Sequence, residues 1–166
     1  MQRFMGKVVL VTGAGSGIGK ASALRLAAEG GSIFCVDLNR EAVESAAAEI
    51  TAEGGVATPW VCDVGNEASV QEAVGACIEG YGSLYGVVNM AGILRFDDTE
   101  ELQTDDWQKV IDINLTGTMF LCRAALPYLV ETRGSIVNAA STAALSGLPC
   151  GLAYSASKGG VLAMTR

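Results

Sequence analysis

The sequence predicts a doubly wound α/β fold, in which helices cover both faces of a parallel sheet with strand order 3-2-1-4-5. Short β-branched runs alternate with longer segments of helical character, as in successive βαβ units. A glycine-rich turn joins the first strand to the first helix, which is typical of this architecture. Right-handed crossovers are assumed for these units. The 166 residues suffice for one domain and are too few for two full-sized ones.

The first half of the chain contains two strand-helix units. The first strand is the aliphatic run Lys7–Val11, and the helix after it, Gly17–Glu29, ends where two glycines follow. The second strand is Ser32–Val36. Asn39 is a favourable N-cap for the second helix, about Arg40–Glu53, and a second pair of glycines closes this unit.

The middle of the chain repeats the pattern with a longer last helix. The third strand covers about Ala57–Cys62. The helix at Glu67–Glu79 shows one apolar stripe at helical spacing. The fourth strand, Leu84–Val88, precedes a loop and a long helix over about Asp105–Glu131.

The end of the chain supplies a fifth strand at Ser135–Asn138 and a last helix that begins near Tyr154. This helix reaches Arg166 without a glycine stop or other C-cap signal. We therefore expect the sequence to be cut within the last helix, with the C-terminal part of the fold missing.

Composition excludes several classes of partner. The formal net charge is −7, the pI is near 4.5, and no lysine or arginine cluster interrupts the acidic surface. Nucleic acid and anionic membranes are therefore not expected as partners. The longest apolar runs, such as Val8–Val11, are far shorter than the ~20 residues of a membrane span. With five widely spaced cysteines and no secretory signal, the chain is expected to be cytoplasmic and reduced.

A glycine-rich turn at Thr12–Gly19 follows the first strand and opens the first helix. Glycines let the backbone approach a pyrophosphate, and the helix N-terminus favours its charge. The spacing is G-x-x-x-G-x-G rather than G-x-G-x-x-G. A tight strand-to-helix connection without a ligand is the alternative. The residues expected to bind the dinucleotide here are Gly13, Ser16, Gly17, Ile18 and Gly19.

Asp37 stands at the end of the second strand, twenty residues after Gly17. A carboxylate at this place accepts hydrogen bonds from both hydroxyls of an adenosine ribose and repels a 2′-phosphate. The sequence therefore predicts NAD as the cofactor, with NADP less favoured. Arg40 is close enough to keep NADP open as the alternative.

Polar residues and a glycine follow the predicted strands. In open α/β sheets ligands bind outside the carboxyl ends of the strands. Each of these residues alone could be a structural loop or cap residue. Their shared position at the carboxyl ends of the strands predicts a single cleft. The residues are Gly13, Asp37, Asp63, Asn89 and Ser141.

Tyr154 and Lys158 stand four residues apart in a segment of helical character, so their side chains share one helix face. An ammonium beside a phenol favours the ionised phenol, which suits a general acid or base. The chain contains no histidine. A phenol rather than an imidazole is therefore the expected proton-transfer group.

Two further polar residues are candidates for the same site. Ser141 follows the fifth strand, where its hydroxyl is expected to stabilise charge on a substrate oxygen. A serine hydrolase is not favoured, because a histidine base and a G-x-S-x-G turn are absent. Asn114 lies inside the long helix at a cost in helix propensity, which indicates a functional hydrogen bond or, alternatively, a solvent-facing side chain. No metal site is expected, since the carboxylates form no ligand cluster.

Taken together, these residues resemble the short-chain dehydrogenase/reductase family over Lys7–Arg166. The resemblance implies a Rossmann-like dinucleotide-binding domain over residues 1–166 and hydride transfer between NAD(H) and an alcohol or ketone. The motifs that carry it are T-G-x-x-x-G-x-G at Thr12–Gly19, Asp63, N-x-A-G at Asn89–Gly92, Asn114, and Ser141 with Tyr154-Ser155-Ala156-Ser157-Lys158.

The resemblance also implies a role for each residue. Tyr154 exchanges a proton with the substrate oxygen, and Lys158 binds the nicotinamide ribose and acts on the phenol. Ser141 orients the substrate, and Asn114 positions a water for proton relay. Asp63 and Val64 contact the adenine, while Asn89, Ala91 and Gly92 line the cofactor channel.

Family members usually continue through two further strands and a substrate-covering segment. We therefore expect a fragment that is poorly active alone and a homodimer or homotetramer in the full-length form. A 3-oxoacyl carrier-protein reductase, a sugar dehydrogenase and a hydroxysteroid dehydrogenase are all compatible with these residues. The alternative from another class is a catalytically silent dinucleotide-binding or oligomer-forming module.

Overall fold

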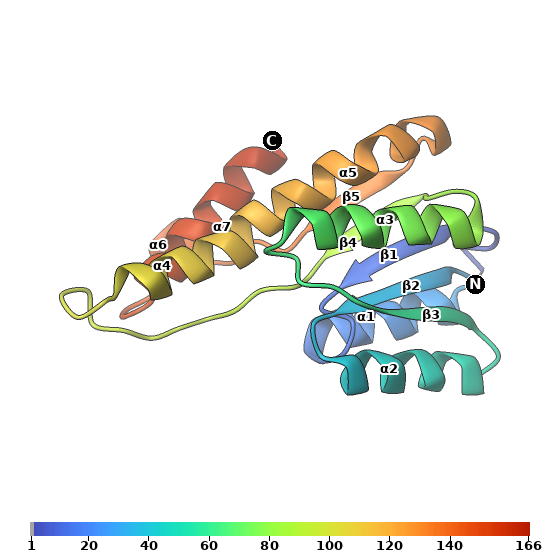
Figure 1. The fold of residues 1–166 in the computed structure, drawn as a ribbon, viewed down its shortest axis with the longest axis horizontal. Coiled ribbons are helices and arrows are strands. Elements are labelled where there is room, and N and C mark those ends of the chain that lie inside the picture. Colours follow the sequence, from blue (N-terminus) through green and yellow to red (C-terminus); the bar gives the residue numbers. More distant parts are fainter. Residues whose placement is uncertain (1) are drawn as a thin grey trace.

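A computed structural model describes residues 2–166 as a five-stranded parallel sheet in the order β3-β2-β1-β4-β5 (Figure 1). This confirms the predicted fold class and strand order. The strands are β1 (Val8–Thr12), β2 (Ser32–Asp37), β3 (Val56–Val61), β4 (Gly86–Asn89) and β5 (Ser135–Asn138). The helices are α1 (Gly17–Ala28), α2 (Arg40–Ala52), α3 (Glu67–Tyr81), α4 (Thr104–Ile111), the π-helical turn η1 (Asp112–Thr116), α5 (Gly117–Thr132), α6 (Ala143–Ser146) and α7 (Leu152–Thr165).

The sheet buries both of its faces. Alternate residues of the central strands enter two separate cores, as expected for parallel strands that helices cover on each side. Val9 and Ile33 pack with α1 and α2 on one face. Leu10 and Phe34 pack with α3 and α5 on the other face. The near-continuous apolar character of the strands in the sequence follows from this double burial.

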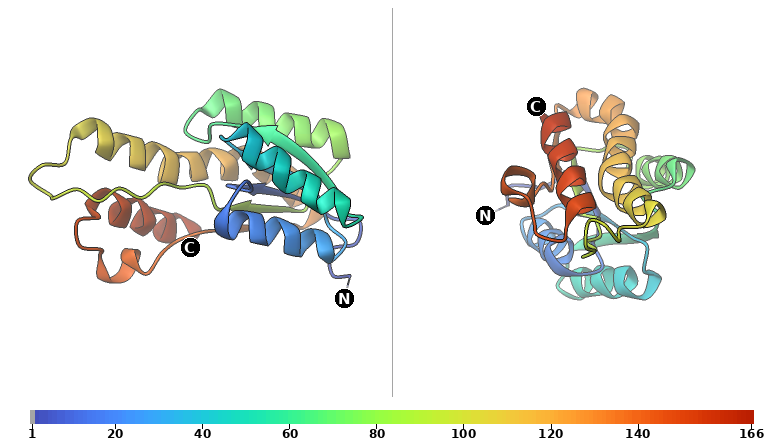
Figure 2. Two further views of the ribbon diagram at one scale, coloured as in Figure 1. Left: turned by 90° about the horizontal axis from the view of Figure 1, so that it is seen from below. Right: turned by 90° about the vertical axis from the view of Figure 1, so that its left-hand side faces the viewer.

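The carboxyl end of the sheet is extended by a separate group of helices. Figure 1 shows α4, α6 and α7 beyond the strand ends, and both views in Figure 2 place α7 alongside the α4–α5 helical stretch. α7 packs against α4, η1 and α6. This packing brings the last helix of the chain to the edge of the sheet where ligands bind in such folds.

Element boundaries differ slightly from the expectation, for reasons that lie in pairing. β1 ends at Thr12 because Thr12 still pairs with Val36 of β2 and Asn89 of β4. The predicted N-cap of α2 is confirmed, since the Asn39 side chain accepts a hydrogen bond from the Ala42 N–H at 3.1 Å. The short helix α6 was not expected. The end of β1 depends on neighbouring strands that local patterns do not report.

The long helix of the prediction is divided by the π-helical turn η1. α4, η1 and α5 together form one stretch, Thr104–Thr132, of 29 residues. Within residues 2–166 it is the one helix whose length and composition would allow it to cross a membrane. This criterion is weak, because core helices of other proteins also meet it. Here Leu121, Ala125 and Leu129 of the stretch belong to the core beneath the sheet.

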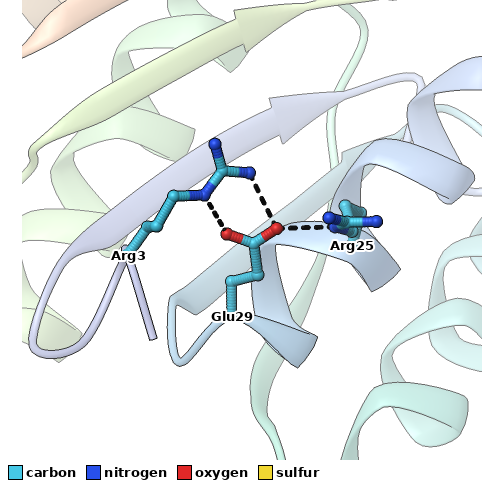
Figure 3. A network of polar contacts seen from close by, with 3 residues as sticks. All are labelled: Arg3, Arg25 and Glu29. Carbon is cyan, nitrogen blue, oxygen red and sulfur yellow. Dashed lines mark hydrogen bonds and ion pairs between the residues drawn. The ribbon is translucent and has the colours of Figure 1, made fainter. Parts of the chain in front are cut away.

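The N-terminal segment is tied to the end of α1 by a charged network (Figure 3). Glu29 is a buried residue, and its carboxylate accepts a hydrogen bond from Arg3 Nη2 at 2.7 Å and from Arg25 Nε at 2.6 Å. Arg3 Nε forms a further bond to the same carboxylate. The hydrogen bonds from Arg3, followed by those from Arg25, lower the pKa of Glu29 to about 2.

We expect the stability of the fold to depend on Glu29 between two pH values. Its contribution is complete above the unfolded-state pKa of ~4.3 and is lost as the pH falls through about 2, the folded-state value. Glu29→Gln should therefore flatten the pH dependence of the urea midpoint in this window. Glu44→Gln, which alters an exposed pair with Arg40, is the control. Equal pH profiles for Glu29→Gln and the unaltered protein would contradict the assignment.

Candidate functional site

A cleft of about 480 Å³ lies at the carboxyl ends of the strands. It brings together residues from the β1–α1 turn, the ends of β2, β3 and β4, and helix α7. The sequence had predicted convergence at this edge from the strand ends alone. Of the predicted site residues, those that line the cleft are Gly13, Ser16, Gly17, Ile18, Gly19, Asp37, Asp63, Val64, Ala91, Gly92, Tyr154 and Lys158.

The glycine-rich turn is shaped by close contacts. A Cβ at Gly19 would lie 2.1 Å from the carbonyl oxygen of Gly13, so only glycine lets α1 approach β1 this closely. Gly17 adopts φ +52 where the helix begins, a conformation that glycine accepts readily. The Ser16 side chain makes no capping hydrogen bond within residues 2–166. The first N–H groups of α1 are therefore free of a side-chain cap, which suits a pyrophosphate.

Asp37 is held at the end of β2 by two backbone donors. One carboxylate oxygen accepts from the Gly15 N–H at 2.9 Å and the other from the Asn39 N–H at 3.0 Å. A Cβ at Gly15 would lie 3.0 Å from the first of these oxygens. Each oxygen keeps lone pairs for further donors, so this rigid carboxylate can accept from ribose hydroxyls. Arg40 pairs with Glu44 instead.

Tyr154 and Lys158 lie one turn apart on α7, as the sequence predicted. The Lys158 ammonium is buried and donates a hydrogen bond to the carbonyl of Ala139 at 2.6 Å. Its Nζ lies 5.8 Å from the centre of the Tyr154 ring. Burial lowers the pKa of Lys158 from its ordinary value. The pair therefore combines a phenol with a desolvated positive charge at the cleft wall.

Asn114 lies in the π-helical turn and is completely buried. Its Oδ1 accepts from the Ile93 N–H at 2.8 Å, and its Nδ2 donates to the Ile93 carbonyl at 2.9 Å and to Ser157 Oγ at 3.1 Å. The solvent-facing alternative is therefore wrong. The side chain uses both of its N–H groups inside the protein, and it fastens the loop that follows β4.

Two further predicted residues, like Asn114, lie beside the cleft rather than among the residues that line it. Ser141 Oγ accepts from the Ala143 N–H at 3.1 Å at the start of α6. Asn89 is buried at the end of β4, where its Nδ2 donates to Asn138 Oδ1 at 2.8 Å. The Asn89 carbonyl also accepts from the Ala139 N–H. Asn89 thus joins β4 to the end of β5 and to Ala139, the residue whose carbonyl accepts the hydrogen bond from Lys158.

Several cleft residues carried no distinctive signal in the sequence. They are mostly apolar neighbours of the polar candidates. For all except Ile113, which lies in the π-helical turn, a position just after a strand end is the signal that could have marked them. The exposed Leu38 follows Asp37, and Ile113 precedes Asn114. The residues not predicted as part of the site are Leu38, Cys62, Met90, Ile113, Ala139 and Ala140.

The fold and the cleft define a Rossmann-like α/β domain with a dinucleotide-type site. The chain belongs to the short chain dehydrogenase family, whose sequence model matches residues 7–166. This confirms the resemblance drawn from the motifs, and it makes the chain part of a family of oxidoreductases.

Named relatives span a range of alcohol substrates. The D-threitol dehydrogenase of Mycolicibacterium smegmatis is 43% identical over 99% of this chain and 64% of its own length. The 3beta-hydroxysteroid dehydrogenase of Mediterraneibacter gnavus is 41% identical over 100% of this chain and 60% of its own length. The crystal structure of NAD+-bound xylitol dehydrogenase has a TM-score of 0.95 and 41% identity, and the match covers 98% of this chain and 64% of that chain. This chain thus spans less than two thirds of each of these three proteins.

Proposed function

We propose that the protein is an NAD(H)-dependent oxidoreductase that interconverts an alcohol and a ketone, with Tyr154 as the general acid and base. The observation that carries the proposal is the meeting of Tyr154 and Lys158 with the glycine turn and Asp37 in one cleft. When bound, the nicotinamide cofactor supplies the site for the hydride. The protein is proposed to position that cofactor and to supply the proton.

The residues of the cleft fit a dinucleotide along its length. The uncapped first turn of α1 suits the pyrophosphate, and Asp37 suits the adenosine ribose. Asp63 and Val64 lie in the same cleft and are proposed to contact the adenine. Lys158, on α7 in the same cleft, is proposed to bind the nicotinamide ribose at the other end of the dinucleotide.

At the reacting end, Tyr154 is proposed to give its phenolic proton to a carbonyl oxygen, or to take the proton of a hydroxyl in the reverse direction. The Lys158 ammonium, 5.8 Å from the centre of the Tyr154 ring, is proposed to place a positive charge beside this phenol. Ser141 is proposed to orient the substrate oxygen, although its hydroxyl in this structure accepts from the start of α6. The Asn114 side chain has its N–H groups occupied, so we propose that it positions the cleft loop.

Cofactor choice is expected to rest on Asp37. Asp37→Ala should weaken NAD binding by about tenfold, since a charge-assisted hydrogen bond to each ribose hydroxyl is lost, and should reduce the preference over NADP. Titration of both cofactors into both proteins measures the effect. Glu53→Ala is the matched control, because Glu53 is an exposed carboxylate at the C-terminal end of α2 and does not line the cleft. Tighter binding of NADP than of NAD by the unaltered protein would contradict the prediction.

The substrate class is proposed to be a small or cyclic secondary alcohol. Support comes from the names of the relatives, which cover polyols and a steroid, and from the apolar residues Ile93 and Leu94 in the cleft. Cofactor-linked turnover over a panel of polyols, cyclic alcohols and hydroxysteroids tests the proposal. Absence of turnover with every member, by the protein in its native length, would favour the alternative of a catalytically silent module.

Self-association and a cytoplasmic location remain proposals from the sequence. Leu126 and Val130 on α5 are exposed large apolar residues, and Val137 is exposed on β5 at the edge of the sheet. Such surfaces support a homodimer or homotetramer. The free thiols of the five cysteines support a reducing compartment.

A further inference from the structure

Ser157 lies inside the Tyr154–Lys158 turn and is completely buried. Its hydroxyl donates to the Tyr154 carbonyl at 2.7 Å and accepts from Asn114 Nδ2 at 3.1 Å. These directions are forced, because a carbonyl can only accept and an amide N–H can only donate. The hydroxyl therefore connects helix α7 directly to the π-helical turn.

The connection continues from Asn114 to the cleft. The Asn114 amide pairs with both backbone groups of Ile93, and Ile93 lines the cleft. A Cβ at Gly92 would lie 3.1 Å from Asn114 Oδ1 and 3.6 Å from Lys158 Nζ. The loop that follows β4 is thus fixed against the same amide and lies next to the ammonium.

Helix α7 packs closely against the π-helical turn near the hydrogen bond between Ser157 and Asn114. Gly160 lies one turn after Ser157, and a Cβ there would lie 2.7 Å from the Leu115 side chain. At Gly160 the backbone of α7 therefore contacts the Leu115 side chain of the π-helical turn. At Ser157 a hydrogen bond joins the same two elements. A change of the amide at Asn114 would be transmitted both to the loop and to the turn that carries Tyr154.

We propose that Ser157 is a positioning residue for the reaction. Its hydroxyl sets the register of the Tyr154–Lys158 turn against the loop at Ile93 through the Asn114 amide. The inference rests on the proposed function. Without the hydroxyl, one buried N–H of Asn114 loses its partner. Rotation of the amide to find another partner would then release Ile93 from its two hydrogen bonds.

Ser157→Ala removes this hydroxyl and keeps a good helix former. In the protein at its native length, kcat should fall by about 10-fold to 100-fold, because misplacement by an ångström has effects of this size. The KM for NAD should stay within about threefold, since the proposed pyrophosphate and adenosine-ribose contacts lie at the start of α1 and the end of β2, away from Ser157. Hydrogen exchange of the Ile93 amide, followed by NMR, should become about tenfold faster.

Two further variants make the result specific. Ser157→Thr keeps a hydroxyl that can bond to a helical carbonyl and should restore most of kcat and the slow exchange at Ile93. Ser22→Ala removes a hydroxyl that donates to the Ile18 carbonyl within α1 and should change neither quantity. If position 157 required only a small side chain and no hydroxyl, threonine would not be expected to restore kcat.

Several outcomes would overturn the inference. They are a kcat of Ser157→Ala within twofold of the unaltered protein, a loss confined to the KM for NAD, or an equal rise of Ile93 exchange in Ser22→Ala. A Ser157→Ala chain that does not fold, beside a folded and fully active Ser157→Thr, would leave only a structural role. Failure of the proposed function looks different, because the unaltered protein would show no turnover while Ile93 exchange still responded to Ser157→Ala.

Discussion

Tyr154→Phe should remove most turnover and leave cofactor binding nearly unchanged. The substitution deletes one oxygen from a ring that lines the cleft and leaves the ring beside Lys158. Loss of a general acid typically lowers the rate by about 100-fold to 10,000-fold. The dissociation constant for NADH should change by less than about threefold, because the phenol is not expected to carry most of the binding energy. Steady-state kinetics and NADH titration on the same preparations measure both effects.

Tyr85→Phe is the matched control for this prediction. Tyr85 lies at the amino end of β4, where its ring contacts the Lys7 ammonium, and loss of its hydroxyl should leave turnover unchanged. Near-full activity of Tyr154→Phe would show that another group transfers the proton. Residues 1–166 contain no histidine, so none of them supplies an imidazole in place of the phenol.

Lys158→Met is expected to damage both turnover and cofactor binding. The ammonium is buried and bonded to the Ala139 carbonyl, and it is proposed to serve the nicotinamide ribose and the phenol together. Methionine fills the volume of the lysine stem without its charge, so a loss reports on the ammonium rather than on packing. We expect kcat to fall by at least about 100-fold and NAD affinity by about tenfold.

The two substitutions separate the two roles of the site. Tyr154→Phe should act on kcat alone, whereas Lys158→Met should act on kcat and on the dissociation constant. A Lys158→Met protein that binds NAD as tightly as the unaltered protein would contradict the ribose contact. One that retains full turnover would contradict the effect of the charge on the phenol.

The sequence predicted the fold well because the signals were local and repeated. Each strand of the sheet is a short apolar run between turn residues, and the glycine turn at Gly13–Gly19 marked which strand comes first in the nucleotide-binding unit. β5 was predicted at the residues that form it. The end of β1 moved to Thr12 because pairing with β2 and β4 decides it, and pairing is not visible along the chain.

The site was predicted less completely than the fold. Tyr154 and Lys158 share a helix face by their spacing, so their meeting followed from the sequence. The position of Asn114 in a π-helical turn did not follow from the sequence. Its hydrogen bonds with Ile93 and Ser157 join segments that are distant along the chain. The hydrogen bonds of Ser157 with Asn114 and Tyr154 were hidden for the same reason. Ser141 was placed after β5 correctly, yet its hydroxyl points to the start of α6, which no spacing rule indicates.

The central step of the proposed function is direct hydride transfer between a substrate carbon and the nicotinamide in this cleft. Incubation of the protein with NAD+ and an alcohol that carries deuterium on the reacting carbon, followed by mass spectrometry of the reduced cofactor, measures this step. We expect one deuterium in each reduced cofactor with the unaltered protein and almost no reduced cofactor with Tyr154→Phe. Reduced cofactor without deuterium, or no reduction with any alcohol of the panel, would contradict the account.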